Sequence, residues 1–273
     1  MLEFDIQCSK DGIPVLHHDK AFVRTCNHGK FTRDFNFKDF PQLTDQINVE
    51  FALNEEKNER FIYKKQKTDS QKINSLEQLL EKLKVIDTNN EVWLNMEFKD
   101  ADRKVIEAVH ELLVKHNKLE RTIWGMSSIN QKQKDHLLLI QENRNQNGQT
   151  NRAKRFASSL DVLKLYAMYF TGLLPFMKLD FQSLQMPWQN EAYKFMEQKQ
   201  YGADSLQYKI QDWVIWIMYQ TGGPLFRHLQ KRGIHTMVWV ANYESDLKLI
   251  NEMGCIDGII TDRPQYVSKL LTQ

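Results

Sequence analysis

Short strand-like runs alternate with helix-like stretches along nearly the whole of this 273-residue chain. The strand-like runs span 2–7, 92–98, 122–126, 155–160, 181–187, 236–242 and 258–262. Helical periodicity fills three of the intervening stretches, at 75–86, 102–116 and 244–254. This alternation predicts an α/β fold in which helices cover a parallel sheet. Because a TIM-type (β/α)8 barrel has eight strands, the seven runs predict such a barrel without its first βα unit.

Local signals mark the ends of two of these helices. Ser75 is followed three residues later by Gln78, which is typical of a capping box at a helix start. Gly254 follows the last periodic residue of its helix and predicts a stop. We expect one domain over residues 1–273, with the polar stretch 141–152 as a surface loop.

The composition excludes several classes of protein. With 37 basic against 35 acidic residues, the chain has no charge signature of a nucleic-acid partner. A hydrophobic content of 41% supports a sizeable core. The three cysteines are widely spaced and form no CxxC pattern, so we expect neither a disulfide framework nor a zinc site built on them. No protein partner can be inferred from the sequence.

An apolar, aromatic-rich segment at 165–177 suggests a membrane surface as a partner. Basic residues flank this segment on both sides: Arg152, Lys154, Arg155, Lys164 and Lys178. Such a pattern suits a helix lying in a membrane interface, and it suits a buried core helix equally well. The chain shows no signal-peptide pattern at its start and no apolar run of 18 residues. We therefore expect a membrane-associated, intracellular protein.

The stretch EFDIQCSKDGIPVLHHD, residues 3–19, carries the most informative polar pattern. Strand alternation puts Glu3 and Asp5 on one face, and likewise puts Glu97 and Lys99 on one face of another strand. Three carboxylates from neighbouring strands are a plausible oxygen site for one divalent cation, Mg²⁺ or Ca²⁺. Solvated strand faces carry the same pattern, so both interpretations remain open.

Two further side chains could complete a hydrolytic site. Lys99 could neutralise a phosphate, and His18 ends an apolar run where it could carry a proton. Carboxylates, a lysine and a histidine around a hard cation can hydrolyse a phosphodiester. The plainer alternatives are a surface charge for Lys99 and a turn cap for His18. His17 should point to the opposite face of an extended segment and is as readily structural as chemical.

Residues 3–19 resemble the signature of the glycerophosphodiester phosphodiesterase family, with its E-x-D strand followed by a turn and H-D. Arg24 and Thr25 fit the R-T that usually follows this signature. NMEFK at 95–99, WVAN at 239–242 and GCIDGIITDRP at 254–264 resemble later motifs of the family, in the same order. The resemblance spans nearly the whole chain and implies a TIM-type barrel with phosphoric diester hydrolase activity.

Other segments resemble one branch of that family. Residues 122–125, 169–176 and 225–240 are similar to the membrane-associated lysophospholipase D members, which act on lysophospholipids. The implied substrates are glycerophosphodiesters or lysophospholipids, with release of the head-group alcohol and lysophosphatidic acid. Six residues match family site positions: Glu3, Asp5 and Glu97 as metal ligands, His18 as the catalytic acid/base, Lys99 as a phosphate contact and Trp239 near the substrate.

One part of the family pattern does not occur in these 273 residues. The family places an H-R-G strand and an E-N-T helix before the E-x-D strand, and they supply a second histidine and a phosphate-binding arginine. We therefore expect the chain as written to be nearly inactive, as a fragment of a working enzyme. The alternatives are a catalytically disabled paralogue that binds lipid at a membrane surface, and a phosphatidylinositol-type phospholipase barrel.

Overall fold

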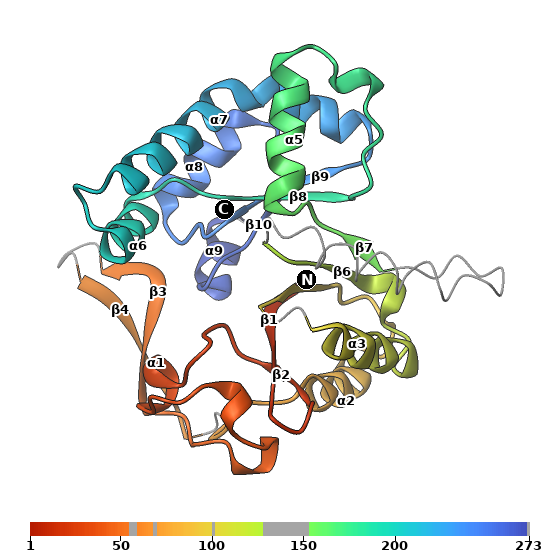
Figure 1. The fold of residues 1–273 in the computed structure, drawn as a ribbon, viewed down its shortest axis with the longest axis vertical. Helices are drawn as coiled ribbons and strands as arrows, with labels where there is room; N and C mark the ends of the chain where they lie inside the picture. Colours follow the sequence, from red (N-terminus) through yellow and green to blue (C-terminus); the bar gives the residue numbers. More distant parts are fainter. Residues whose placement is uncertain (55–58, 68–69, 100–101, 128–152, 272–273) are drawn as a thin grey trace. The chain divides into compact units, whose positions relative to one another are not determined.

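The computed structural model describes residues 1–54, 59–67, 70–99, 102–127 and 153–271 (Figure 1). The described residues form two compact units, each of which is described by itself. The first unit comprises Met1–Ile47 and Lys64–Lys164, and the second comprises Asn48–Tyr63 and Leu165–Gln273. The expected surface loop at 141–152 lies outside the described residues.

A parallel sheet organises the first unit. Its strands are β1 (Leu2–Cys8), β5 (Leu94–Phe98), β6 (Thr122–Gly125) and β7 (Lys154–Arg155), which pair in that order. The short strand β2 (Pro14–Leu16) returns antiparallel along β1. Its helical elements are α1 (Val23–Cys26), η1 (Thr32–Asp34), η2 (Phe37–Asp39), α2 (Leu76–Ile86), α3 (Arg103–Lys115) and η3 (Leu119–Arg121). The start of α5 (Ser159–Phe170) also belongs to this unit.

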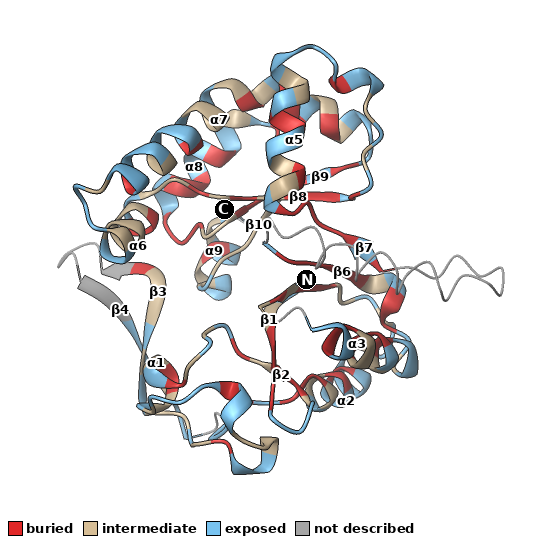
Figure 2. Cartoon of the chain, viewed as in Figure 1, coloured by how far each residue is buried: buried red, intermediate tan, exposed pale blue. Residues whose placement is uncertain are grey.

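One face of this sheet is covered by α2 and α3. Alternate residues of the strands pack there against apolar residues of the two helices, and this core includes Ile6, Met96, Phe98, Trp124, Leu80 and Val109. Figure 2 shows buried residues along these strands and on one side of each helix. Because side chains alternate along a strand, the neighbours of the core residues must project from the other face. That second face carries the polar residues predicted to form a site.

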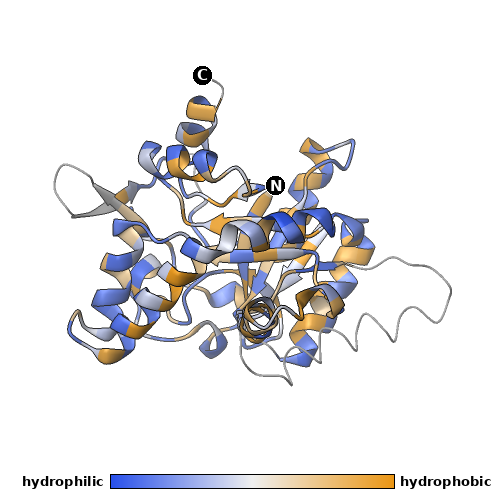
Figure 3. Cartoon of the chain, turned by 90° about the horizontal axis from the view of Figure 1, so that it is seen from above, coloured by the Kyte–Doolittle hydropathy of each residue, from blue (hydrophilic) through white to orange (hydrophobic). Residues whose placement is uncertain are grey.

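A second parallel sheet organises the second unit. Its strands β8 (Ser183–Pro187), β9 (His235–Trp239) and β10 (Gly258–Ile259) pair in the order β10-β9-β8. The helices here are η5 (Leu174–Phe176), α6 (Glu191–Tyr201), α7 (Leu206–Lys231), α8 (Glu244–Met253) and α9 (Pro264–Leu271). The strands β3 (Gln46–Asn54) and β4 (Glu59–Lys64) form a separate two-stranded sheet, most of which belongs to this unit. Figure 3 shows hydrophobic and hydrophilic residues side by side along the helices, as in amphipathic helices.

Six of the seven predicted strands are confirmed with shifted ends, as are the three predicted helices, whereas the strand predicted at 155–160 overlaps the structure only at Arg155. The capping box is present at α2, where the Gln78 amide donates to Ser75 Oγ (3.2 Å) and the Ser75 amide donates to Gln78 Oε1 (2.9 Å). Gly254 ends α8 with a φ of +59°, a left-handed conformation that suits glycine. The sequence signals at these two helix ends are therefore confirmed.

The strand predicted at 155–160 is shorter than expected. β7 ends at Arg155, and α5 begins at Ser159. The cause is the carboxylate of Asp161, which accepts hydrogen bonds from the guanidinium of Arg155 (2.7 Å) and from the amide and hydroxyl of Ser158. These bonds stabilise the first turn of the helix and end the extended segment.

The long helix α7 and the pair β3 and β4 were not predicted. Gly222, Gly223 and Pro224 in sequence indicate a helix break, since proline lacks the amide hydrogen that helix bonding requires. The helix nevertheless continues through them. At Gly222 an added Cβ would lie 2.6 Å from the ring of Phe226, so this glycine permits a close approach of that ring.

The apolar segment at 165–177 is divided between burial and exposure. Leu165, Tyr166 and Leu174 are buried, whereas Phe170 and Phe176 are exposed. Burial in the core therefore holds for part of the segment, and the membrane-interface interpretation of the exposed part stays a prediction. Among the described residues, no helix combines the length and apolar character needed to cross a membrane.

The first core yields a stability prediction. Leu80 of α2 is 1% exposed and Ile86 of the same helix is 68% exposed. We expect Leu80→Ala to lower the free energy of unfolding by about 2–5 kcal/mol, because it leaves a cavity between α2 and the sheet. Ile86→Ala, the matched control, should change it by less than about 0.5 kcal/mol. Urea unfolding followed by circular dichroism measures both, and equal effects would contradict this assignment of the core.

Candidate active site

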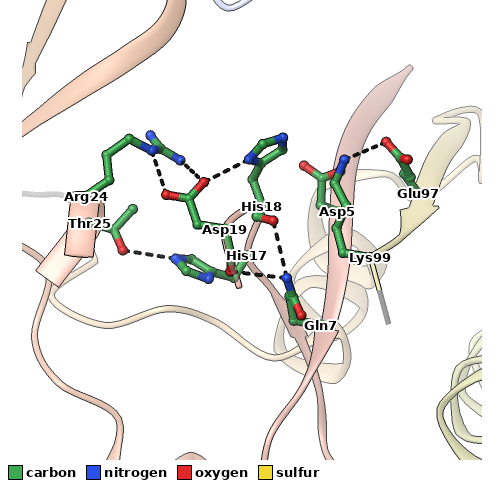
Figure 4. Close-up of polar contacts among 9 residues, drawn as sticks. All are labelled: Asp5, Gln7, His17, His18, Asp19, Arg24, Thr25, Glu97 and Lys99. Atoms are coloured by element: carbon green, nitrogen blue, oxygen red, sulfur yellow. Dashed lines mark hydrogen bonds and ion pairs between the residues drawn. The ribbon is translucent and has the colours of Figure 1, made fainter. Parts of the chain in front are cut away.

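Two polar strand faces meet along the pairing of β1 with β5. In this parallel register Asp5 lies opposite Glu97, and Glu3 lies opposite Asn95. Figure 4 shows Asp5 and Glu97 projecting toward the ammonium group of Lys99. Lys99 directly follows β5, and its amide donates to the carbonyl of Ile6 (3.0 Å), which continues the strand pairing past the end of β5. The predicted neighbours on the two strands are thus brought together.

The two carboxylates share the ammonium of Lys99. Its Nζ lies 2.7 Å from Glu97 Oε2 and 3.2 Å from Asp5 Oδ1. The other oxygen of Glu97, Oε1, accepts a hydrogen bond from the amide of Ser127 (3.2 Å). All three charged side chains are at most about one-quarter exposed, so water screens their interaction only in part.

Burial and charge set different pKa values for the two carboxyl groups. Burial raises the pKa of Asp5, and the nearby charges of Lys99 and His18 offset only part of that rise. Burial also opposes ionisation of Glu97, but attraction to Lys99 and the hydrogen bonds from Lys99 and Ser127 outweigh it and lower the pKa. Burial disfavours the ammonium too, yet Asp5 and Glu97 raise the pKa of Lys99. Glu97 therefore stays ionised, and Asp5 takes up a proton first.

The neighbours His17 and His18 point in opposite directions, as the extended segment predicts. His17 is buried, and its Nε2 lies 2.9 Å from Thr25 Oγ1. Burial lowers the pKa of His17, which keeps this imidazole neutral. The side chain of His18 is exposed, and its Nδ1 lies 2.8 Å from Asp19 Oδ1. Figure 4 shows His18 on the side of Asp5 and His17 turned toward Thr25.

Asp19 holds His18 and is itself held by Arg24. The guanidinium donates through Nε to Asp19 Oδ2 (2.7 Å) and through a terminal nitrogen to Oδ1 (2.8 Å). Burial opposes ionisation of Asp19, but the bonds from His18 and Arg24 prevail and hold its pKa well below the usual range. Because this carboxylate stays ionised, Nδ1 of His18 carries the hydrogen, and Nε2 is the nitrogen left for chemistry.

Hydrogen bonds from β1 fix the backbone on which these histidines stand. Gln7, on the same strand face as Asp5, donates through Nε2 to the carbonyls of His18 (3.3 Å) and Asp19 (3.1 Å). The amide of His17 donates to the carbonyl of Asp5 (3.1 Å). Sequence reasoning assigned no role to Gln7, Asp19 or Arg24, although the two-residue alternation and the quoted H-D and R-T pairs were available signals.

The residues present fit a hard divalent cation. Asp5 and Glu97 converge on one positive charge, and they offer the oxygen ligands that Mg²⁺ and Ca²⁺ prefer. Glu3 lies two residues before Asp5 on the same face of β1, with an exposed side chain. The structure thus brings two of the predicted ligands together and places the third beside them along the strand.

Trp239 lies in the second unit, at the end of β9. Its ring makes edge contacts with Phe51 (6.0 Å between centroids) and Tyr193 (6.2 Å), and the side chain is partly buried. The sequence prediction placed it near the substrate, and that role stays a prediction. Sequence reasoning did not anticipate its two aromatic neighbours, because they are far from it along the chain.

Two motifs of the second unit are joined by Asn242. Its Nδ2 donates to Asp262 Oδ2 (3.1 Å), and its Oδ1 accepts from the hydroxyl of Thr261 (2.8 Å) and the amide of Asp262 (2.9 Å). Asn242 also donates to the carbonyl of Phe51 (3.0 Å). The segments 239–242 and 254–264, noted separately in the sequence, therefore form one hydrogen-bonded junction.

Comparison with known proteins shows which family has a similar sequence. The model of the glycerophosphoryl diester phosphodiesterase family matches residues 1–266. Lysophospholipase D GDPD1 of Homo sapiens is 25% identical over 276 residues, covering 99% of this chain and 76% of that protein. Lysophospholipase D GDPD3 of Mus musculus is 26% identical, covering 97% of this chain and 71% of that protein.

Solved structures support the fold. The structure of an Oleispira antarctica phosphodiesterase in complex with the product sn-glycerol-3-phosphate superposes with a TM-score of 0.53 at 16% identity. The match covers 99% of this chain and 84% of that one. This likeness assigns the chain to the α/β, TIM-type barrel class expected from the sequence.

The shared ammonium leads to a prediction about ionisation. We expect Lys99→Met to raise the pKa of both Asp5 and Glu97, because it removes the positive charge that favours their ionised forms. Carboxyl carbon shifts measured by NMR against pH, in the presence of a chelator, report both values. Lys115→Met is the matched control, since Lys115 pairs with Glu77 and leaves Asp5 and Glu97 untouched. Unchanged titration in Lys99→Met would show that the ammonium does not lie between the two carboxylates.

Proposed function

We propose that this chain hydrolyses lysophospholipids or glycerophosphodiesters. It belongs to the glycerophosphoryl diester phosphodiesterase family, and this membership makes it a phosphoric diester hydrolase. The cleavage would be of the lysophospholipase D type, which releases the head-group alcohol and leaves lysophosphatidic acid. The observation that carries this proposal is the facing pair Asp5 and Glu97 around one positive charge, with His18 beside them. The two lysophospholipase D relatives support the choice of substrate class.

A divalent cation would be held by Asp5 and Glu97, with Glu3 as the third carboxylate on that strand face. When bound, Mg²⁺ or Ca²⁺ would polarise the phosphoryl oxygens and stabilise the developing negative charge. Lys99, already drawn to this position by both carboxylates, would provide a second positive charge for the phosphate. The low pKa of Glu97 keeps one ligand ionised throughout the neutral range.

His18 would supply the proton that the reaction needs. Attack of water on phosphorus breaks the bond to the head-group oxygen, and Nε2 of His18 would protonate that departing oxygen. Asp19 would hold the ring through Nδ1 and stabilise its protonated form, while Arg24 keeps Asp19 ionised and in place. The family resemblance ascribes the second proton transfer to the histidine of an H-R-G motif.

We further propose that the protein works at a lipid surface. The first support is the exposed apolar part of the 165–177 segment, including Phe170, Leu173 and Phe176. Of its basic flanks, Lys164 and Lys178 are exposed, and Arg152 lies outside the described residues. The inclusion of Arg155 was wrong, because its side chain is buried against Asp161.

The helix α7 gives a second, unpredicted support for lipid contact. Its first half exposes large apolar residues at helical spacing: Leu206, Ile210, Trp213, Val214 and Trp216. Tryptophan favours the interface between water and lipid, because its ring is apolar and its indole nitrogen needs a polar partner. An outward face of this kind with exposed Lys209 within it is typical of a helix lying on a membrane.

The proton-carrier role of His18 is tested by substitution. We expect His18→Ala to lower kcat about 10²–10⁴-fold with little change in KM, because a proton carrier acts in the transition state. Choline release from lysophosphatidylcholine and from glycerophosphocholine, with and without a chelator, measures this. The assay compares the chain itself with a version extended by a strand carrying His-Arg-Gly followed by Glu-Asn-Thr.

The control for His18 is His235→Ala, an exposed histidine at the start of β9 in the other unit, which should leave kcat unchanged. Chelator-sensitive turnover that survives His18→Ala would show that another residue protonates the leaving group. Saturable lipid binding without any turnover, in both versions of the chain, would favour the disabled lipid-binding paralogue instead.

Lipid contact is tested by co-sedimentation with phosphatidylcholine vesicles containing anionic lipid. We expect the bound fraction to fall severalfold in Phe170→Ser/Phe176→Ser and in Trp213→Ser/Trp216→Ser, because each pair removes exposed apolar surface. The double variant Gln207→Ala/Gln220→Ala changes exposed polar residues of the same helix and should bind like the parent. Parent-like binding by all three variants, each with an intact circular dichroism spectrum, would count against both surfaces.

A further inference from the structure

A second group of potential ligands lies on α2 and at the end of α3, away from the strand faces. Glu77 and Glu81 stand four residues apart and so share one face of α2. His116 is the residue that caps the C-terminal end of α3. One ligand atom from each of these three side chains lies within 4.8 Å of the others, a spacing that a single metal ion can bridge.

The buried side chain of His116 gives independent support for a bound ion. Its side chain is only 5% exposed, and its Nε2 is buried without a hydrogen-bond partner. The nearest carboxylate oxygen, Glu81 Oε1, lies 3.7 Å away, which is beyond hydrogen-bond distance. A buried polar atom without a partner is costly, and an ion bound between this nitrogen and the two carboxylates would satisfy it.

We propose that Glu77, Glu81 and His116 bind a borderline divalent cation of the Zn²⁺ class. An imidazole nitrogen with two carboxylates is a donor set that suits Zn²⁺ or Co²⁺, whereas the all-oxygen set at Asp5 and Glu97 suits Mg²⁺ or Ca²⁺. The C-terminal end of α3 adds a favourable negative potential for a cation. This proposal does not depend on the proposed function.

Lys115 is the group that competes with such an ion. Its Nζ lies 2.5 Å from Glu77 Oε1, but both side chains are about half exposed. An exposed ion pair of this kind contributes little stability, so a divalent cation can displace the ammonium from Glu77. A bound ion would then link α2 to α3 and hold together the two helices that cover the first core.

The experiment is a calorimetric titration of the full chain with Zn²⁺, in excess Mg²⁺ so that the oxygen site is occupied. We expect binding of a single equivalent that weakens at least ~10-fold in His116→Asn and in Glu81→Gln. Lys115→Ala should tighten it, because the competing ammonium is gone. The control Glu120→Gln, an exposed carboxylate on the neighbouring η3, should bind like the parent.

Asp5→Asn separates this site from the candidate active site and should leave Zn²⁺ affinity unchanged. Loss of Zn²⁺ binding in Asp5→Asn would place the ion at the strand carboxylates and overturn the proposal. Parent-like affinity in both His116→Asn and Glu81→Gln would overturn it as well. Thermal unfolding with and without Zn²⁺ gives a second readout, in which the ion should raise the midpoint of the parent and not that of His116→Asn.

Discussion

The pairing of β1 with β5 through a shared ammonium is the interaction on which the candidate site depends. Asp5 and Glu97 stand opposite each other because the strands are parallel and in this register, and Lys99 lies between their carboxylates. Two buried negative charges on neighbouring strands repel each other unless a cation lies between them. The apolar residues on the other face of the same strands fix the register, because a slip by one residue would move the charges into the core.

A second ion pair extends this arrangement to the proton carrier. Arg24 holds Asp19, Asp19 holds the imidazole of His18, and Gln7 of β1 holds the backbone carbonyls beneath them. Each carboxylate in this group therefore has a cationic partner that helps to keep it in place. Asp5 is the exception in its ionisation, since burial outweighs its partners and raises its pKa. The site thus combines two different carboxyl groups. Glu97 stays ionised, whereas the raised pKa of Asp5 makes its ionisation depend on a nearby positive charge.

Much of this arrangement could be predicted from the sequence, for identifiable reasons. Strand alternation is local, so it correctly put Glu3 with Asp5 and Glu97 with Lys99 on common strand faces and turned His17 away from His18. The cap at Ser75 and the stop at Gly254 are local as well. Contacts between segments that are distant along the chain could not be predicted from such local patterns. The bond of Asn242 to Asp262 and the ring contacts of Trp239 depend on tertiary packing, and the continuation of α7 past Pro224 departs from the local signal.

The two adjacent histidines also determine which kinds of genetic change this segment tolerates. His17 and His18 have the same chemistry, and only their order after the turn at Gly12 separates a buried neutral ring from an exposed one. Many substitutions between β1 and β2 would leave that order intact. The insertion or loss of a single codon in the turn would instead turn each ring to the opposite side of the extended chain and so move it out of its present surroundings. The length of this turn is therefore constrained, in addition to the glycine that the positive φ at Gly12 favours.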